Sequence, residues 1–351
     1  MKAVFLCAGQ GTRMRPISYS VPKHLVPLAN KKLLRYNVEK VIDGGIHDIG
    51  LVVSPEMESH YRKVLGEGRW GATFTYLHQV NPRGLAHAVD CARDFVGDEP
   101  FLVYLGDNLL EEKLSPMIEE FSSSDACASI LLSPVEDPER FGVAVLDGDR
   151  IVNLVEKPDD PPSNLAIVGA YGFTEEIFNA IEVIEPSDRG ELEITDAIQE
   201  LINRGKLVTP SKLTGWWLDV GRPRDALNAN RVILENLTGR IDGYLRDTEL
   251  EKEGKIEVGE NVRVSDSRLV GPLSLHRDIE VEGSTIGPNV SLGPNCRIKG
   301  SQMENSIVME GTLVERAKLT NSILGAGSRL SLTGESIEIF AGNQTCIESS
   351  S

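Results

Sequence analysis

Residues 1 to about 235 alternate between short apolar runs and longer segments whose apolar residues recur at helical spacing. The runs predict buried strands, and the segments between them predict helices. Strands that alternate with helices indicate an α/β fold with a mostly parallel sheet covered on both faces. The expected strands are Ala3–Leu6, Ile49–Val53, Phe74–Leu77, Phe101–Leu105 and Ala128–Leu132, and the expected helices are Lys32–Val41, Leu85–Phe95, Leu114–Phe121, Glu193–Leu201 and Asp225–Leu237.

A second pattern, with an apolar residue at every sixth position, occupies the last part of the chain. Ile286-Gly-Pro-Asn-Val-Ser is followed at once by Leu292-Gly-Pro-Asn-Cys-Arg and then by Ile298. A period of six fits neither a helix nor a single strand, and it predicts a left-handed parallel β-helix with about 18 residues per coil and about five coils. The same spacing recurs at Leu269, Leu275 and Val281, and at Ile307, Leu313 and Leu319.

The two patterns meet at a polar stretch. We therefore expect an α/β domain at residues 1–237, a linker at 238–252, a β-helix domain at 253–343 and a tail at 344–351. The β-helix is expected to serve assembly or regulation. A homo-oligomer is expected, for example a trimer formed through these coils.

The charge balance changes which partners are expected. The chain has 53 acidic and 36 basic residues, a formal net charge of −17, which argues against a nucleic-acid partner. No apolar run approaches the roughly 20 residues of a membrane helix, and the N-terminal run ends in glycines, so a cytoplasmic protein without a membrane partner is expected. Free thiols, rather than a zinc site or disulfides, are expected at Cys7, Cys91, Cys127, Cys296 and Cys346.

The first candidate chemistry follows the first strand. Gly9-Gln10-Gly11-Thr12-Arg13 is a glycine loop that can present several backbone N–H groups to a phosphate. Arg15 and Lys23 add nearby positive charge. The loop matches neither the dinucleotide-binding fingerprint nor the P-loop, and on its own it could equally be a turn with solvated charges.

Two single carboxylates also follow apolar stretches. Asp107 comes after Phe101–Leu105, and Asp219 ends the run that begins at Trp216. A turn aspartate that caps the next element is the alternative for each. Mg²⁺ often takes one or two carboxylates and completes its coordination with substrate phosphates and water. The two residues therefore form a candidate Mg²⁺ site.

Seven segments of the chain, taken in their order along the sequence, resemble the motifs of the sugar-1-phosphate nucleotidyltransferases. Within that family, the chain most resembles the long form of glucose-1-phosphate thymidylyltransferase, which has a C-terminal left-handed β-helix. The resemblance covers about residues 1 to 235 and implies a Rossmann-like nucleotidyltransferase catalytic domain. The matching segments are Ala8–Arg13 with Pro22, Lys23, Pro27 and Asn30, then Gln79–Ala86, Gly106–Asn108, Arg140–Val143, Val155–Pro158, Val168–Tyr171 and Arg189–Asp196.

The resemblance also implies roles for individual residues. Arg13, Lys23 and Lys157 are the implied catalytic residues, and Asp107 and Asp219 the implied Mg²⁺ ligands. The implied reaction transfers dTMP from dTTP to glucose 1-phosphate and yields dTDP-glucose and pyrophosphate. The nucleotide site is implied at Leu6, Ala8, Gly9, Gly11, Thr12, Gln79, Pro82, Gly84 and Asp107, and the sugar-phosphate site at Gly142, Glu156, Lys157 and Tyr171.

Three other functions stay open. His24 stands where thymidylyltransferases often carry Gln, which leaves a UTP-dependent uridylyltransferase as the first alternative. Hexapeptide acyltransferases need a base in the coils, where only His276 lies, and a surface position is expected for it. A non-catalytic nucleotide-sugar sensor is the third alternative. Loss of Arg13, Lys23, Asp107 or Asp219 would indicate it, and all four residues are present.

Overall fold

The computed structural model describes residues 1–66, 70–332 and 334–348. The chain forms two compact units, one made of Met1–Gly9 and Leu34–Leu218 and the other of Gln10–Leu33 and Asp219–Ser351. The second unit therefore combines the glycine-loop segment with the C-terminal coils. The division into domains at 1–237, 238–252, 253–343 and 344–351 stays a prediction.

The first unit is built on a nine-stranded sheet with the order β10-β9-β11-β6-β1-β4-β5, in which β8 pairs with β11 and β12 with β8. The strands around β1 and the β8–β12 pair are parallel, but β11 runs antiparallel to β6, β8 and β9. The sheet is mixed rather than mostly parallel. Its strands are β1 Lys2–Leu6, β4 Asp48–Val53, β5 Thr73–His78, β6 Phe101–Leu105, β8 Ala128–Pro134, β9 Gly142–Asp147, β10 Arg150–Glu156, β11 Leu165–Phe173 and β12 Val208–Lys212, with short β7 Asn108–Leu110 and β13 Trp217–Asp219 outside it.

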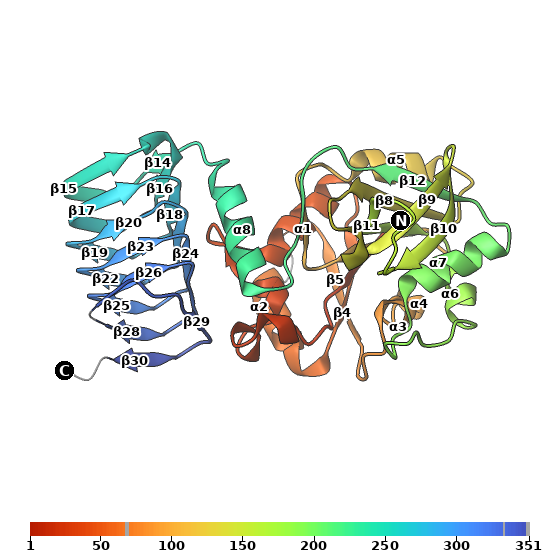
Figure 1. The fold of residues 1–351 in the computed structure, drawn as a ribbon, viewed down its shortest axis with the longest axis horizontal. Coiled ribbons are helices and arrows are strands. Elements are labelled where there is room, and N and C mark those ends of the chain that lie inside the picture. Colours follow the sequence, from red (N-terminus) through yellow and green to blue (C-terminus); the bar gives the residue numbers. More distant parts are fainter. Residues whose placement is uncertain (67–69, 333, 349–351) are drawn as a thin grey trace. The chain divides into compact units, whose positions relative to one another are not determined.

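Helices cover this sheet, as the periodicity predicted (Figure 1). The expected helix at residues 85–95 is divided in two, because Ala92, at φ −97° and ψ 0°, leaves the helical conformation. None of the helices in the described ranges is long and apolar enough to cross a bilayer. The helices are α1 Leu33–Asp43, α2 Glu58–Leu65, α3 Leu85–Asp90, α4 Arg93–Val96, α5 Ser115–Ser122, α6 Glu176–Ile181 and α7 Ile194–Asn203, with α8 Pro223–Leu234 in the second unit.

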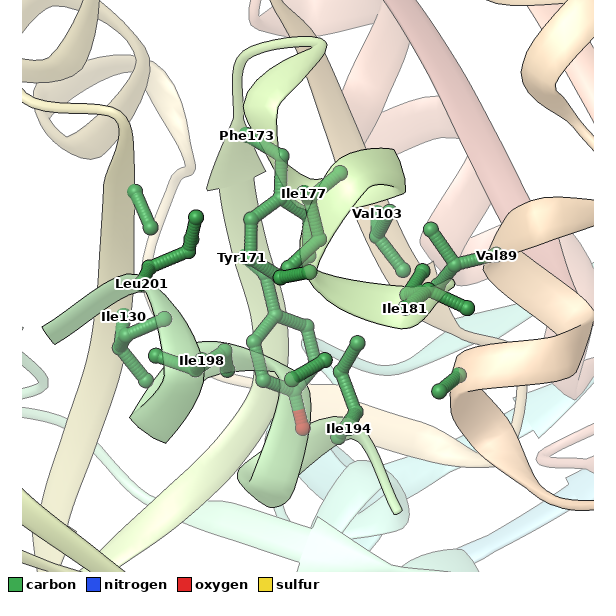
Figure 2. Packing of buried hydrophobic residues seen from close by; sticks show 14 of the residues in the cluster. Val89, Val103, Ile130, Tyr171, Phe173, Ile177, Ile181, Ile194, Ile198 and Leu201 are labelled. Carbon is green, nitrogen blue, oxygen red and sulfur yellow. The ribbon is translucent and has the colours of Figure 1, made fainter. Parts of the chain in front are cut away.

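One core cluster fills the space between the sheet and helices α3, α4, α6 and α7. Figure 2 shows Tyr171 and Phe173 of β11 packed between Ile177, Ile194 and Ile198. The rings of Tyr171 and Phe173 stack with centroids 5.6 Å apart. On the other face, a Cβ at Gly172 would lie 2.5 Å from the ring of Phe121 in α5. The sheet is thus covered closely on both sides.

The C-terminal part of the second unit is a parallel β-helix, whose strands stack as rungs in Figure 1. Corresponding positions in successive coils are 17 or 16 residues apart, not 18. One sheet contains β14 Arg240–Ile241, β16 Ile256–Val258, β18 Leu273–Leu275, β21 Val290–Leu292, β24 Ser306–Val308, β27 Ile323–Leu324 and β29 Phe340–Ala341. The other contains β15 Tyr244–Glu251, β17 Arg263–Val270, β19 Glu280–Glu282, β20 Thr285–Ile286, β22 Arg297–Lys299, β23 Gln302–Glu304, β25 Leu313–Glu315, β26 Lys318–Thr320, β28 Arg329–Ser331 and β30 Cys346–Glu348.

The coils differ from the predicted pattern in several places. The expected linker at 238–252 carries β14 and β15, and the expected tail carries β30, while residues 349–351 lie outside the described ranges. Because one coil is a residue shorter than its neighbour, Val314 is the buried residue rather than the predicted Leu313. His276 is half-buried rather than at the surface, and burial lowers its pKa. All five cysteines lie in the described ranges and carry thiols rather than disulfides, as expected.

Buried serines join the coils at one corner. The Oγ atoms of Ser267, Ser284 and Ser301 accept hydrogen bonds from the backbone N–H one coil further on, at 3.0, 3.0 and 3.2 Å. Each hydroxyl also donates to the carbonyl two residues earlier. A serine here satisfies a backbone N–H that the coil would otherwise bury unpaired, whereas the carbonyl also accepts from a backbone N–H of the next coil.

Replacing Ser301 with Ala should lower the free energy of unfolding by about 1–3 kcal/mol, because the buried Ala317 N–H loses its acceptor. Urea unfolding of the whole chain measures this difference. The matched control is Ser331→Ala, which removes only an acceptor for the exposed Arg316 side chain. Equal losses of stability in the two variants would contradict the stabilising role of the serine ladder, the series of hydrogen-bonded serines Ser267, Ser284 and Ser301.

Candidate functional site

The ends of β1 and β6 lie side by side in the first unit. Leu6 pairs with Leu105, and the Gly106 N–H donates to the Leu6 carbonyl at 3.2 Å. The segments that leave these strands contain Gly9 and Asp107. Ligands of α/β proteins bind at such carboxyl ends of strands. The start of the predicted phosphate loop and the predicted metal ligand Asp107 therefore both lie where a binding site is expected.

Asn108 connects the elements around Asp107. Its amide donates to Asp107 Oδ1 at 3.0 Å, and its Oδ1 accepts from Trp217 Nε1 at 2.6 Å and from the Gly169 N–H at 3.2 Å. Asn108 is only 3% exposed. A Cβ at Gly169 would lie 2.8 Å from the Asn108 amide, so only glycine leaves room for it. The sequence prediction gave Asn108 no role of its own.

Asp107 fits the type of carboxylate that Mg²⁺ takes. Burial raises the pKa values of Tyr104 and Tyr171 far above the usual range, and the negative charge of Asp107 adds to both shifts. This carboxylate therefore lies beside poorly hydrated groups, where a cation would be attracted. Within the described ranges, His, Cys, Asp and Glu side chains form no group of three or more placed to hold a metal.

A charged cluster surrounds Glu156 at the end of β10. Its Oε1 lies 3.4 Å from Lys157 Nζ and 3.2 Å from Arg189 Nη2, and its Oε2 accepts from Thr195 Oγ1 at 3.4 Å. A Cβ at Gly142 would lie 2.9 Å from the Glu156 carboxylate. The structure thus brings together three of the predicted sugar-phosphate residues, Gly142, Glu156 and Lys157.

Arg189 extends this cluster to a buried carboxylate. It pairs with Glu193 at 2.7 Å, and Glu193, which is 3% exposed, also accepts from Ser187 Oγ at 2.8 Å. Burial raises the pKa of Asp196, and the neighbouring Glu193 and Glu156 charges raise it further. The segment Arg189–Asp196 had been matched in the sequence without a chemical role. Its spacing of charged residues was the available signal.

An aromatic pair adds apolar surface to the same region. The rings of Phe141 and Trp217 lie 5.0 Å apart at an angle of 56°. Trp217 is the residue that donates to Asn108, and Phe141 directly precedes Gly142. The backbone of Lys157, with φ 41°, donates to the Phe141 carbonyl at 3.0 Å. The aromatic pair therefore links the surroundings of Asp107 to those of Glu156.

The predicted base-recognition segment is held by its own hydrogen bonds. Gln79, 3% exposed, directs its amide nitrogen to the Gly84 carbonyl at 3.3 Å and to His87 Nδ1 at 3.0 Å. These contacts fix the direction of the Gln79 amide. Pro82 is exposed, between these two residues. Recognition of a base by Gln79 stays a prediction.

The ring of Tyr171 is buried in the core, while its hydroxyl group lies close enough to Glu156 for that negative charge to add to the rise in its pKa that burial causes. It is 3% exposed, and its ring belongs to the core cluster shown in Figure 2. Its contacts explain it as a packing residue. A role in sugar binding stays a prediction.

In the second unit, the glycine loop is compact. Gly11 is left-handed at φ 60° and ψ 35°, and its carbonyl accepts from Ser18 Oγ at 2.7 Å. A Cβ at Gly11 would lie 3.6 Å from Lys23 Cβ, so the stem of Lys23 runs beside this glycine. Thr12 and Arg13 follow in an exposed 3₁₀ turn, η1 Thr12–Met14, while His24 is 2% exposed.

Arg13 and Asp219 also come together in this unit. A Cβ at Gly221 would lie 3.5 Å from Arg13 Nη2 and 3.7 Å from Asp219 Oδ2. The side chains of the predicted phosphate cation and the predicted metal ligand thus border the same glycine.

Comparison with known proteins assigns the family. Residues 2–236 match the family model described as nucleotidyl transferase. The chain belongs to this family. It is therefore an enzyme that transfers a nucleotidyl group, as the resemblance implied.

Two relatives match nearly the whole chain. A glucose-1-phosphate thymidylyltransferase from Streptomyces antibioticus is 43% identical over 93% of this chain and 92% of its own length. The low-salt glycan biosynthesis nucleotidyltransferase Agl11 from Haloferax volcanii is 42% identical over 94% of both chains. Both matches extend beyond the α/β part into the coils.

A solved structure matches about two thirds of the chain. It comes from Bacillus anthracis, holds a sucrose and carries the name glucose-1-phosphate thymidylyltransferase provisionally. The identity is 36% and the TM-score 0.63, over 68% of this chain and 98% of that one. The nucleotidyltransferase fold is thus shared at the level of the α/β sheet.

Gly84→Ala should destabilise this nucleotidyltransferase by more than about 3 kcal/mol, because φ is +113° and a Cβ would lie 2.6 Å from the Leu192 backbone nitrogen. The matched control is Gly190→Ala, where φ is +74° but nothing lies within 4 Å of the new Cβ. The control should cost about 1–2 kcal/mol, the penalty of the left-handed backbone alone. Urea unfolding of both variants measures the difference, and similar losses would show that the Leu192 contact contributes little.

Proposed function

We propose that the enzyme transfers dTMP from dTTP to glucose 1-phosphate and forms dTDP-glucose and pyrophosphate. The observation that carries this proposal is the 43% identity to a thymidylyltransferase over 93% of the chain, including the coils. The Glu156 cluster supports it, because it combines a carboxylate suited to sugar hydroxyls with two cations suited to a phosphate.

In the proposed reaction, a phosphate oxygen of glucose 1-phosphate attacks the α-phosphorus of dTTP in line. The bond from that phosphorus to the bridging oxygen breaks, and pyrophosphate leaves. The attacking phosphate is already ionised near neutral pH, so no side chain has to remove a proton. Catalysis then depends on positioning and on compensation of charge.

The side chains of the first unit have roles on the sugar side. Glu156, fixed by Thr195 and Arg189, accepts hydrogen bonds from sugar hydroxyls, and Lys157 binds the phosphate of the sugar. Gly142 has no side chain that would displace the Glu156 carboxylate. Gln79 hydrogen-bonds to the pyrimidine edge of the nucleotide.

The cations of the glycine loop have roles on the triphosphate side. Lys23 binds the α-phosphate, and Arg13 binds the β- and γ-phosphates and the departing pyrophosphate. Asp107 and Asp219 are the residues that would hold Mg²⁺. When bound, this ion compensates the charge on the phosphate oxygens. The strong net negative charge of the chain makes such local cations necessary for an anionic substrate.

UTP is the second candidate nucleotide. The relative at 42% identity has a name that specifies no base, and His24 replaces the usual Gln. Pyrophosphate release, with dTTP, UTP, GTP and CTP each tested against glucose, mannose and N-acetylglucosamine 1-phosphates, decides between them. A dominant signal from dTTP with glucose 1-phosphate supports the proposal. A dominant signal from UTP would identify UTP, rather than dTTP, as the nucleotide substrate. No turnover by the folded protein would favour the non-catalytic nucleotide-sugar sensor. The cytoplasmic location and the homo-oligomer stay predictions from the sequence.

Arg13→Ala and Asp107→Ala should each reduce kcat about a hundredfold or more, because each removes one preorganised charge contact. Steady-state pyrophosphate release in saturating Mg²⁺ measures the effect. Arg204→Ala and Asp98→Ala remove the same charges from exposed positions and should leave kcat within about twofold. Near-normal turnover by Asp107→Ala would exclude its role in metal binding.

Glu156→Gln should raise the KM for glucose 1-phosphate about tenfold and leave the KM for dTTP unchanged, because it removes a charge-assisted acceptor while the side-chain shape is kept. Two-substrate kinetics separate the two constants. A larger change in the KM for dTTP than in that for the sugar phosphate would move Glu156 out of the sugar site.

A further inference from the structure

The segment that carries Arg13 and Lys23 ends in a small hairpin. Strands β2 Pro27–Leu28 and β3 Lys31–Lys32 pair antiparallel, and the two residues between them, Ala29 and Asn30, have φ values of 43° and 66°. Two consecutive left-handed residues are typical of a type I′ hairpin turn. Alanine is an unfavourable residue for this conformation, so contacts elsewhere in the second unit must stabilise the turn.

Asn230, in the middle of α8, provides the first of these contacts. Its Oδ1 accepts from the Ala29 N–H at 2.8 Å and from Ser291 Oγ at 2.6 Å. Its amide nitrogen is directed to the Asn289 carbonyl at 3.4 Å. Asn230 and Ser291 are each 1% exposed. One buried amide therefore joins the hairpin turn to the β-helix.

Two further contacts attach the same segment to other coils. Asn30 Nδ2 donates to the carbonyl and to Oγ of Ser274, both at 2.9 Å. Ser20 Oγ accepts from the Asn343 N–H at 3.1 Å. Ser274 and Ser291 belong to β18 and β21, and Asn343 follows β29, so all three contacts lie along the same sheet of the β-helix.

The attachment reaches the cations through short paths in the chain. Lys23 begins a 3₁₀ turn, η3 Lys23–Leu25, which is followed by β2, and the Val26 carbonyl accepts from the Leu33 N–H after β3. Helix α8, which carries Asn230, starts just after Gly221, the residue bordered by Arg13 and Asp219. A shift of the hairpin or of α8 would therefore move these side chains.

We propose that Asn230 is a positioning residue, and that the β-helix takes part in nucleotide binding by holding the phosphate segment 10–33 in place. This inference rests on the proposed function, in which Arg13 and Lys23 bind the triphosphate. It gives the coils a role beyond assembly. An amide suits position 230 because it accepts from the N–H of the turn and can also donate to the Asn289 carbonyl, a combination that neither Ala nor an ionised Asp supplies.

The test compares Asn230→Ala, Asn30→Gly and a matched control, Asn228→Ala. Gly keeps the left-handed turn at position 30 while removing the side-chain bonds to Ser274. Asn228 has an exposed side-chain amide on the same helix, and its Oδ1 accepts a hydrogen bond from Arg231. Hydrogen exchange of the full-length protein should be about tenfold faster in segment 10–33 for both test variants, and unchanged for Asn228→Ala.

Two-substrate kinetics provide the second measurement. Both test variants should raise the KM for dTTP about tenfold and leave the KM for glucose 1-phosphate unchanged. Faster exchange in segment 10–33 together with this split supports the proposal. Unchanged exchange, or faster exchange with an unchanged KM for dTTP, overturns it. If Asn230→Ala does not fold, Asn30→Gly decides by the same criteria.

The proposed function fails in a different way. If the unaltered enzyme releases no pyrophosphate from dTTP or UTP, that function is wrong whatever the variants do. Binding of dTTP, followed by titration calorimetry, then replaces the kinetic measurement. Weaker binding by Asn230→Ala and Asn30→Gly, but not by Asn228→Ala, supports the positioning role, and equal binding by all three overturns it.

Discussion

A polar group that is removed from water must find a partner, and this constraint organises both compact units. In the first unit the Asn108 amide satisfies Asp107, Trp217 and Gly169 at once. In the second unit the Asn230 amide does the same for Ala29, Ser291 and Asn289. The serine ladder repeats the principle from coil to coil. In each case a buried side chain accepts a hydrogen bond from a backbone N–H in another part of the chain.

Charge is concentrated where an anionic substrate is expected. The chain as a whole is strongly acidic, yet Lys157 and Arg189 meet at Glu156, and Arg13 borders Gly221 beside Asp219. Because each cation has a carboxylate nearby, its position is defined before a substrate arrives. Preorganised charges of this kind stabilise a transition state without the cost of reorienting water.

The coils and the glycine loop form one unit although the chain separates them by some two hundred residues. This grouping gives a physical reason why relatives at 42% and 43% identity match through the coils as well as the α/β part. A parallel β-helix is a rigid support, since the strands between the two ends of the stack are paired on both sides. Contacts on one of its sheets can then hold a loop that has little regular structure of its own.

The sequence by itself determined the two architectures, the family and the positions of β1, β4, β5, β6 and β8, because periodicity and motifs are local properties of the chain. Phe101–Leu105 is a strand with the expected bounds, and the hexads at Ile286 and Leu292 are buried in the coils. Only the tertiary structure decided the coil length, the move from Leu313 to Val314, the mixed sheet and the core position of Tyr171. The most distant partners of Asn108 and Asn230 lie 109 and 201 residues away, so no local pattern could have identified them.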